Sequence, residues 1–142
     1  MSVSARNQLA GTVSAITPGS VNDEVEITLE QGGKLVSVIT ASSRNTLGLD
    51  KGKQAVALIK APWVILATED SGFLFSARNQ FPGKITSVDT GAVNSNVHVQ
   101  TDEGFSLTSV ITNESATEMA LSVGTRVVAL IKASSVLLAV KK

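Results

Sequence analysis

A five-residue stretch, Ser-Ala-Arg-Asn-Gln, occurs twice in this chain, at residues 4–8 and again at residues 76–80. Sliding the sequence by 72 positions aligns residues 4–68 with residues 76–140 without a gap, and 28 of the 65 aligned residues are identical. Ala-Leu-Ile-Lys-Ala, near the end of each half, is a second shared stretch. Self-similarity at one fixed period indicates a tandem duplication, so we expect the chain to fold as two similar units.

The duplication predicts two domains, residues 4–68 and residues 76–140, with a linker at residues 69–75 between them. The linker contains the pair Ser71 and Gly72, residue types that favour turns and loops. Because the linker is short, the two domains should lie side by side.

Each unit is small, and its composition is unusually apolar. A unit of about 65 residues lies near the lower limit for independent folding. Hydrophobic residues make up 43% of the chain and charged residues only 17%, so few charged side chains are available to cover apolar surface. We therefore expect an obligate oligomer in which another copy of the chain buries part of this surface.

The composition also argues against several classes of protein. Lysines plus arginines equal the acidic residues, 12 of each, which disfavours a broad basic surface for nucleic acid. No cysteine is present, so disulfides and thiolate metal sites are excluded. The N-terminal residues lack the apolar run of a signal peptide, and the most apolar stretch, residues 55–67, is too short to span a bilayer. We expect a cytoplasmic protein without membrane contact.

Strand periodicity dominates each copy. Residues 24–29 alternate between apolar and polar, as in a strand with one buried face. Thr40 and Thr112 are typical N-cap residues, each ahead of one short helix, and these helices are predicted to end at Leu47 and Met119. The other predicted strands are residues 12–17, 34–39, 55–59 and 64–67, and in the second copy residues 127–131 and 136–140.

These elements predict an all-β fold with two tandem OB-like five-stranded β-barrel domains, each carrying one short helix. A two-sheet sandwich is the alternative architecture for the same pattern. The fourth strand of each copy is apolar on both faces, so it should be covered on both sides.

The repeated stretches are rich in hydrogen-bond donors and contain no carboxylate. In the first copy, Ser4 offers a hydroxyl, Arg6 a guanidinium fork and Asn7 an amide, and Lys60 adds an ammonium. Such a set suits an anion with several oxygens, and the lack of Asp and Glu in the motifs favours an oxyanion that carries no proton. The alternative interpretation is that Arg6 and Lys60 are solvated residues at strand ends.

Four repeated motifs together resemble the molybdenum-pterin-binding-protein-like family of domains, the Mop/TOBE domains. The motifs are the Ser-Ala-Arg-Asn-Gln start, the Gly-x-Val-Asn turn at residues 19–22 and 91–94, the Ser-Val-Ile-Thr stretch at residues 37–40 and 109–112, and the Ile-Lys-Ala close. Because they recur in the same order in both copies, the chain is similar to the two-domain molbindins, a family of cytoplasmic molybdate-binding proteins.

The resemblance implies OB-like domains, six of which assemble around a threefold axis, here as a homotrimer of two-domain chains. It also implies oxyanion sites at interfaces between domains and subunits, where the Ser-Ala-Arg-Asn stretch of one domain meets the Lys-Ala-Ser segment of another. The implied molybdate-binding residues are Ser4, Arg6, Asn7, Lys60, Ala61, Ser76, Arg78, Asn79, Lys132, Ala133 and Ser134.

Pro62 stands where the second copy has Ser134, which removes a hydroxyl and a backbone N–H, so a site that uses Pro62 should be weaker or differently built. Thr40 and Thr112 are candidates for a second type of anion site, since a helix N-terminus presents free N–H groups. The alternative for both threonines is that they only cap their helices.

The leading hypothesis is a non-enzymatic protein that binds molybdate, and tungstate nearly as well, for intracellular molybdenum storage, homeostasis and delivery to cofactor synthesis. No catalytic cofactor or metal ion is expected, and the single histidine, His98, allows no Ser-His-Asp grouping. One alternative is a molybdate-sensing regulatory module that acts on a partner protein. Another is an OB-fold protein that binds single-stranded nucleic acid, which the scarcity of aromatic residues disfavours.

Overall fold

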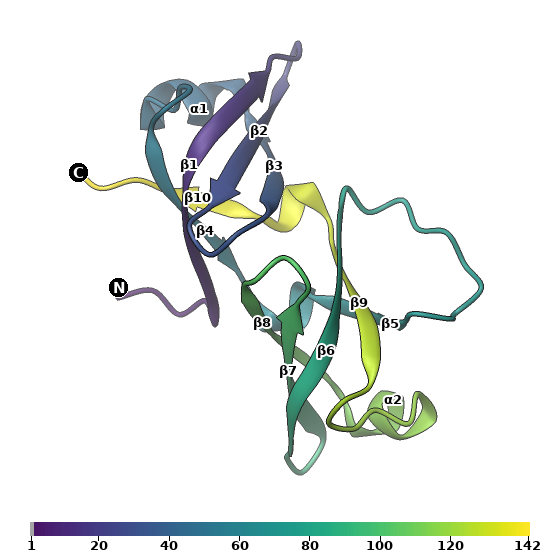
Figure 1. The fold of residues 1–142 in the computed structure, drawn as a ribbon. Helices are drawn as coiled ribbons and strands as arrows, with labels where there is room; N and C mark the ends of the chain where they lie inside the picture. Colours follow the sequence, from purple (N-terminus) through teal and green to yellow (C-terminus); the bar gives the residue numbers. More distant parts are fainter. Residues whose placement is uncertain (1) are drawn as a thin grey trace.

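The computed structural model describes residues 2–142, and each element of the first half recurs in the second (Figure 1). The first half contains β1 (Asn7–Thr17), β2 (Asn22–Leu29), β3 (Lys34–Thr40), α1 (Ala41–Leu47), β4 (Gln54–Ile59), the 3₁₀ turn η1 (Ala61–Trp63) and β5 (Ile65–Thr68). The second half contains β6 (Asn79–Thr90), β7 (Asn94–Thr101), β8 (Ser106–Thr112), α2 (Asn113–Glu118), β9 (Arg126–Ile131), the 3₁₀ turn η2 (Ala133–Ser135) and β10 (Leu137–Ala139).

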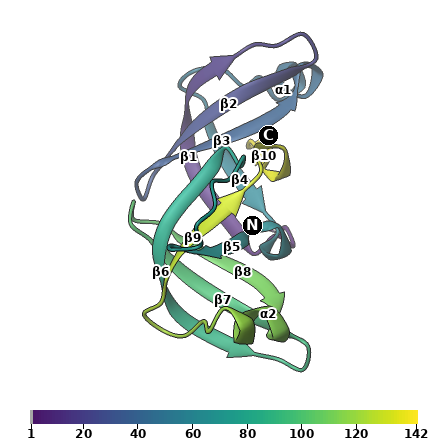
Figure 2. The ribbon, with the colours of Figure 1, turned by 90° about the vertical axis from the view of Figure 1, so that its right-hand side faces the viewer.

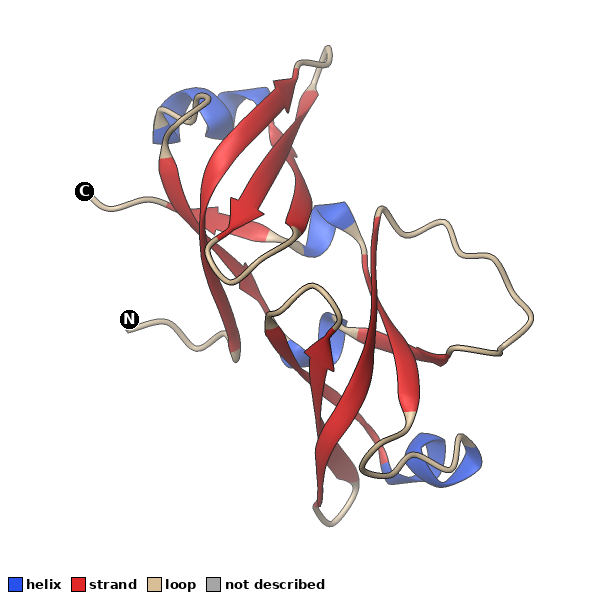
Figure 3. Cartoon of the chain, viewed as in Figure 1, coloured by secondary structure: helices blue, strands red, loops and turns tan. Residues whose placement is uncertain are grey.

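Strands dominate the molecule, and the two α-helices lie at its opposite ends (Figure 3). Two five-stranded antiparallel sheets form, with the strand orders β10-β4-β1-β2-β3 and β5-β9-β6-β7-β8. The first and last strands of each sheet contact each other, so each sheet curls into an OB-like half-barrel. The prediction of two small barrel domains with one short helix each is confirmed.

The fifth strands are exchanged between the two halves. We expected β5 and β10 to complete the sheets of their own copies, but β5 pairs with β9 of the second half and β10 pairs with β4 of the first (Figure 2). Two buried serines hold the exchanged segments, because Ser37 donates to the carbonyl of Val136 (2.7 Å) and Ser109 to that of Val64 (2.6 Å). Neither half therefore completes its sheet without the other. The boundaries 4–68 and 76–140 stay a prediction.

The first strand of each half is longer than its sequence pattern suggested. β1 begins at Asn7 and passes through Gly11, whereas the pattern alone predicted a strand that starts after this glycine. A Cβ at Gly11 would lie 2.5 Å from the carbonyl oxygen of Thr28, so the close approach of β2 requires glycine there. A bulge between Val13 and Ala15, repeated between Ile85 and Ser87 in β6, bends each long strand and lets the sheet curl.

The turns after β2 and β7 contact each other at the seam between the halves. Gly32 and Gly104 both have φ near +120°, at 117° and 119°. A Cβ on Gly32 would clash with the carbonyl oxygen of Glu103, and one on Gly104 would clash with that of Gln31. Both the backbone conformation and the lack of space therefore require glycine in these two turns.

A single hydrophobic core runs through both halves, with Ile27, Leu35, Phe105 and Leu107 among its fully buried side chains. The fourth strands β4 and β9 are buried on both faces over most of their length, as their two-sided apolar pattern predicted. Within residues 2–142, no helix is long and apolar enough to cross a membrane.

Candidate functional site

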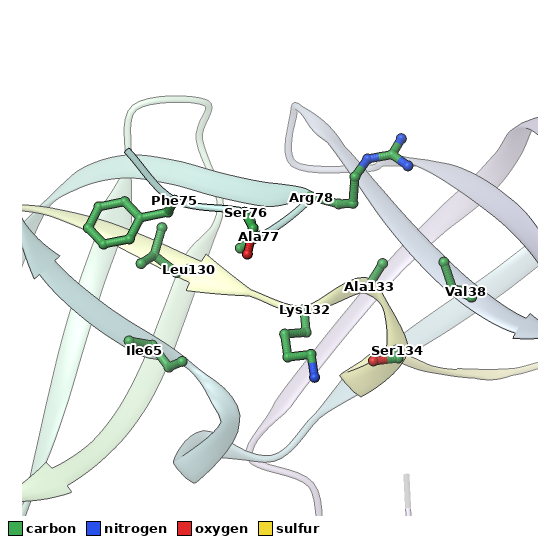
Figure 4. A pocket seen from close by; sticks show the side chains of 10 residues that line it. All are labelled: Val38, Ile65, Phe75, Ser76, Ala77, Arg78, Leu130, Lys132, Ala133 and Ser134. Carbon is green, nitrogen blue, oxygen red and sulfur yellow. The ribbon is translucent and has the colours of Figure 1, made fainter. Parts of the chain in front are cut away.

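A pocket of about 430 Å³ lies beside the start of β6, where residues that are far apart in the chain come together (Figure 4). Five of the residues that the sequence analysis singled out line this pocket: Ser76, Arg78, Lys132, Ala133 and Ser134. Two segments of the second half supply them, residues 75–78 before β6 and residues 132–134 after β9. The structure therefore brings the second-copy motifs together within one chain.

The strand pairing explains why these two segments meet. Asn79, the first residue of β6, pairs with Ile131, the last residue of β9. Arg78 and Lys132 come directly before and directly after this pair, so antiparallel pairing places both at the same end of the sheet. The segment of residues 75–78 is held in place by Gln80, whose amide donates to the carbonyl oxygen of Phe75 (2.9 Å).

The remaining wall of the pocket is mostly apolar. Phe75 and Leu130 come from the second half, Ile65 from the exchanged strand β5, and Val38 from β3 of the first half. The apolar wall thus spans both halves, whereas both donor segments come from the second half. A site at which the Ser-Ala-Arg-Asn stretch of one domain meets the Lys-Ala-Ser segment of another stays a prediction. A low-polarity wall strengthens the electrostatic attraction between an anion and the nearby cations.

Arg78 lines the pocket, but its guanidinium is directed away from the other polar side chains there. Figure 4 shows its side chain pointing away from Lys132 and Ser134. The guanidinium Nη1 forms an ion pair with Oε1 of Glu24 on β2 of the first half. No sequence pattern indicated this pair, because the two residues are far apart in the chain and belong to different copies.

In the first half, the equivalent cations have different surroundings. Arg6 is exposed, and it is absent from the ion pairs formed within residues 2–142. The ammonium of Lys60 lies 5.7 Å from the ring centroid of Trp63, within the range of a cation–π interaction. Ser135 stands at the position equivalent to Trp63, so Lys132 has no such aromatic partner there.

The other predicted first-copy residues also lie at the ends of β1 and β4. Ser4 is exposed in the segment before β1, and Ala61 is buried as the first residue of η1. Pro62 follows inside that turn, where Ser134 of η2 supplies a hydroxyl and an N–H in the second half. The first-copy segment accordingly offers two hydrogen-bond donors fewer than its counterpart.

The two predicted asparagines have a structural role that the sequence did not reveal. Asn7 is buried, and its amide donates to the carbonyls of Ile59 (3.2 Å) and Thr108 (2.8 Å), while its Oδ1 accepts from the N–H of Thr108 (2.7 Å). Asn79 bonds both backbone groups of Val36 in the same way, at 2.8 Å each. Each asparagine therefore joins its own half to the third strand of the other half. An additional contact with an anion stays a prediction.

Thr40 and Thr112 cap their helices. The hydroxyl oxygen of Thr40 accepts from the N–H of Ser43 (3.0 Å), and that of Thr112 accepts from the N–H of Ser115 (3.1 Å). The predicted N-caps are thereby confirmed. Neither threonine lines the 430 Å³ pocket, and a second anion site at these positions stays a prediction.

His98 lies on the surface strand face of β7, away from that pocket. Its Nδ1 lies 3.1 Å from the hydroxyl of Thr108, and its Nε2 lies 3.2 Å from a carboxylate oxygen of Asp89. Within residues 2–142, no group of three or more potential metal-ligating side chains is found. The chemistry that the pocket supports is therefore hydrogen bonding and charge attraction from Ser76, Lys132 and Ser134, with the nearby Arg78 engaged by Glu24.

Comparison with known proteins gives one matching family and several relatives. A model of the TOBE domain matches residues 3–66 and again residues 76–138. The crystal structure of ModG, described as a cytoplasmic molybdate-binding protein with molybdate bound, is similar with a TM-score of 0.93 and 46% sequence identity. The alignment covers 99% of this chain and 100% of the ModG chain.

Two curated proteins are similar over nearly the whole chain. The molybdenum transport protein ModE of Herbaspirillum seropedicae is 40% identical over 142 residues, which are 100% of this chain and 53% of ModE. The molybdenum-pterin-binding protein MopA of Rhodobacter capsulatus is 40% identical over 139 residues, which are 98% of this chain and 52% of MopA. The chain thus spans about half the length of these curated relatives.

Proposed function

The chain belongs to the TOBE-domain family, with one copy of the domain in each half, and we propose that it binds molybdate as a non-enzymatic protein. The resemblance to two-domain Mop/TOBE proteins that the repeated motifs indicated is confirmed by the family match and by the likeness to ModG. The ligand is proposed from the relatives, because ModG is described as molybdate-binding and ModE and MopA carry molybdenum in their names.

One observation carries this proposal for the present chain. Ser76, Lys132 and Ser134, which the family resemblance implies as oxyanion ligands, line one pocket together with Arg78. A tetrahedral dianion loses much of its hydration when it is buried, so it needs several fixed donors and at least one cation. The pocket offers two hydroxyls, an ammonium, and the N–H groups at the start of η2, which have no partner within the turn.

The proposed preference for molybdate over phosphate rests on the lack of a carboxylate among the residues that line the pocket. At neutral pH, phosphate usually carries a proton that must be donated to an acceptor, and no carboxylate lines the pocket. Tungstate has the same charge and shape as molybdate and should bind nearly as well. We propose that the sites are completed at interfaces between domains and subunits.

A homotrimer of two-domain chains is the proposed assembly, and paired apolar surface supports it. Ile65 and Leu137 lie at equivalent positions on the outer strands β5 and β10 and are exposed to nearly the same extent, 55% and 56%. Val21 and Val93 are likewise exposed by 69% and 70%. Edge strands with exposed apolar residues favour pairing with another chain, and burial of the same positions in both halves fits an assembly of identical subunits.

Storage, buffering and delivery of molybdenum in the cytoplasm is the proposed role. The description of ModG as a cytoplasmic molybdate-binding protein supports the compartment and the ligand, and the role goes beyond that description. A molybdate-sensing module that acts on a partner protein is the second candidate. It is favoured by one observation, that the chain spans only about half the length of ModE and MopA, in which the same unit is part of a longer polypeptide. A pull-down with and without molybdate separates the two roles.

Isothermal titration calorimetry with sodium molybdate, and with sulfate and phosphate as comparison anions, tests the ligand. We expect saturable binding of molybdate that is tighter than that of either comparison anion. A chain that gives no binding heat with molybdate, and none with tungstate, would contradict the proposed function. Native mass spectrometry of the same samples gives the number of subunits and of bound anions. A monomer with molybdate bound would contradict the trimer and the completion of the sites between subunits, but not the proposed ligand.

Arg78→Ala should weaken molybdate binding by about tenfold or more, because a charge-assisted hydrogen bond is lost. Lys84→Ala is the matched control, since Lys84 is an exposed cation on β6 that does not line the pocket. Both variants lose one positive charge. An equal effect of the two substitutions would show that general charge, and not the pocket, controls binding.

A further inference from the structure

Arg78 of the second-copy site forms an ion pair with the carboxylate of Glu24, which belongs to the other half of the chain. We propose that the Glu24 carboxylate competes with the oxyanion for the guanidinium of Arg78. Arg78 must therefore break its ion pair with Glu24 before it can contribute fully to anion binding at this site. The inference rests on the proposed function of the pocket and adds a residue that lies outside the family motifs.

The position of Glu24 makes it a fixed neighbour of the pocket. In the pairing of β2 with β3, Glu24 lies directly opposite Val38, and Val38 lines the pocket. Residues that lie opposite each other in an antiparallel pair project from the same face of the sheet. The carboxylate is therefore held on the side of the sheet where the pocket opens, within reach of the guanidinium.

Competition follows from charge and from the number of donors. A guanidinium has five N–H groups in a planar fork, and the ion pair with Glu24 directs part of this fork away from Lys132 and Ser134 (Figure 4). A bound dianion would also be repelled by the negative charge of Glu24. Both effects lower the affinity of the pocket for an anion, and removal of the carboxylate abolishes both.

The first-copy arginine provides the natural comparison. The position equivalent to Glu24 is Asn96, which lies opposite Val110 in β8 as Glu24 lies opposite Val38. An asparagine cannot form an ion pair, and Arg6 takes part in no ion pair within residues 2–142. The two copies therefore differ by a single charge at this strand position. Because Asn96 already occupies the position in β7, an asparagine should also fit at position 24 of β2.

The experiment measures molybdate binding by titration calorimetry in chains that carry Arg6→Ala, so that the second-copy site dominates the signal. Glu24→Asn introduces the residue of the other copy, and Glu24→Gln removes the charge with little change of size. Glu118→Gln on α2, at the far end of the second half, is the control that loses the same charge away from the pocket. The mirror variant Asn96→Glu is made in a chain that carries Arg78→Ala.

We expect both Glu24 variants to bind molybdate about two- to fivefold more tightly than their parent, the magnitude that a half-exposed ion pair accounts for. This gain should shrink toward none as the salt concentration rises to about 1 M, because screening weakens the ion pair. Asn96→Glu should weaken binding at the first-copy site by a similar factor, and Glu118→Gln should change neither site.

Unchanged or weaker binding in both Glu24 variants, or a gain that is independent of salt, would overturn the inference while the proposed function stands. A lower affinity for phosphate in these variants, without a gain for molybdate, would also overturn it, because Glu24 would then act as an acceptor for a protonated anion. Failure of the unmodified chain to bind molybdate would reject the proposed function and this inference together.

Discussion

The two halves of the molecule share one backbone but surround their cations differently. In the second half Lys132 faces the pocket and Arg78 is paired with Glu24, whereas in the first half Arg6 lacks an ion pair within residues 2–142 and Lys60 lies over Trp63. In each copy, therefore, one of the two motif cations contacts a side chain that is a different residue type at the equivalent position of the other copy. Duplication has preserved the donors while the side chains around them have changed, so the two sites should differ in affinity.

Unlike the side chains around the cations, the residues that join the two halves are the same in both copies. Asn7 and Asn79 are identical, as are Ser37 and Ser109, and each crosses to the other half to bond its backbone. A change in one copy of such a pair would leave a buried or partly buried backbone group without this partner, which is costly. Contacts across the seam therefore explain why these positions match between the copies, independently of any ligand.

The largest effect is expected when the asparagine contacts are broken. Asn7→Ala removes three hydrogen bonds and Asn79→Ala removes two, and both leave buried or partly buried backbone groups without these partners. We expect a loss of about 2–4 kcal/mol in the free energy of unfolding for each, with Asn7→Ala the more severe. Urea denaturation followed by circular dichroism measures both. Gln80→Ala, which removes only exposed bonds, should cost far less, and an equally large loss there would contradict the role given to the seam.

A smaller effect is expected at the ends of the helices. Gly48 ends α1 in the left-handed conformation with φ at 63°, and Ala120, its equivalent after α2, has φ at 52°. A side chain in this conformation is unfavourable, so Ala120→Gly should stabilise the chain and Gly48→Ala should destabilise it, each by about 1 kcal/mol. Thermal denaturation of both variants checks the two opposite signs. A loss of stability with Ala120→Gly would show that the flexibility gained in the unfolded chain outweighs the relief of strain.

Trp63→Ser should make the first-copy site more like the second. Loss of the ring releases Lys60 from a cation–π interaction that contributes about 0.5–1 kcal/mol at an exposed position. We expect the first-copy site to bind molybdate about two- to fivefold more tightly in a chain carrying Arg78→Ala, measured by calorimetry. Ser135→Trp should weaken the second-copy site in return, and opposite outcomes would show that Trp63 itself supports binding.

The subtlest difference concerns acid stability. In the first half, the N–H of Gly19 (3.0 Å) and the guanidinium of Arg44 (2.5 Å) donate to Asp23 and hold the pKa of its carboxyl below the ordinary value. A lowered pKa in the folded state stabilises the fold above the ordinary value, and this stabilisation is lost as the pH falls below about 4. Asp23→Asn should therefore flatten the decline of the melting temperature in this range.

The second half contains the control for that experiment. Ser95 replaces Asp23 and hydrogen-bonds to Asn113 at 2.5 Å, so neither group titrates in the acid range. Ser95→Ala should lower stability equally at all pH values. A Ser95→Ala effect that grows in acid would show that the decline arises elsewhere in the molecule.

Much of the fold could be predicted because the signals are local. Alternation along residues 24–29 marks a strand with one buried face, and Thr40 and Thr112 mark the starts of the helices, as the structure confirms. Part of the candidate site could be predicted for a similar reason. The repeated motifs of the second copy lie at the same end of two adjacent strands and so converge on one pocket.

The exchange of β5 and β10 could not be predicted, because an apolar strand fits the edge of either sheet equally well in its local pattern. The role of Asn79 was hidden for a related reason, since the same amide can bind an anion or a backbone segment. Glu24 gave no signal at all, because its partner Arg78 is 54 residues away in the other copy.

The sequence alone determines that this protein contains two copies of a small barrel with a donor-rich motif at the start of each first strand, because periodicity and duplication are properties of the chain itself. Only the tertiary structure decided that the copies complete each other's sheets and that Glu24 of one half meets Arg78 of the other. Those contacts depend on which surfaces pack together in space, and the packing of distant segments is settled by the free energy of the whole fold and not by any local pattern.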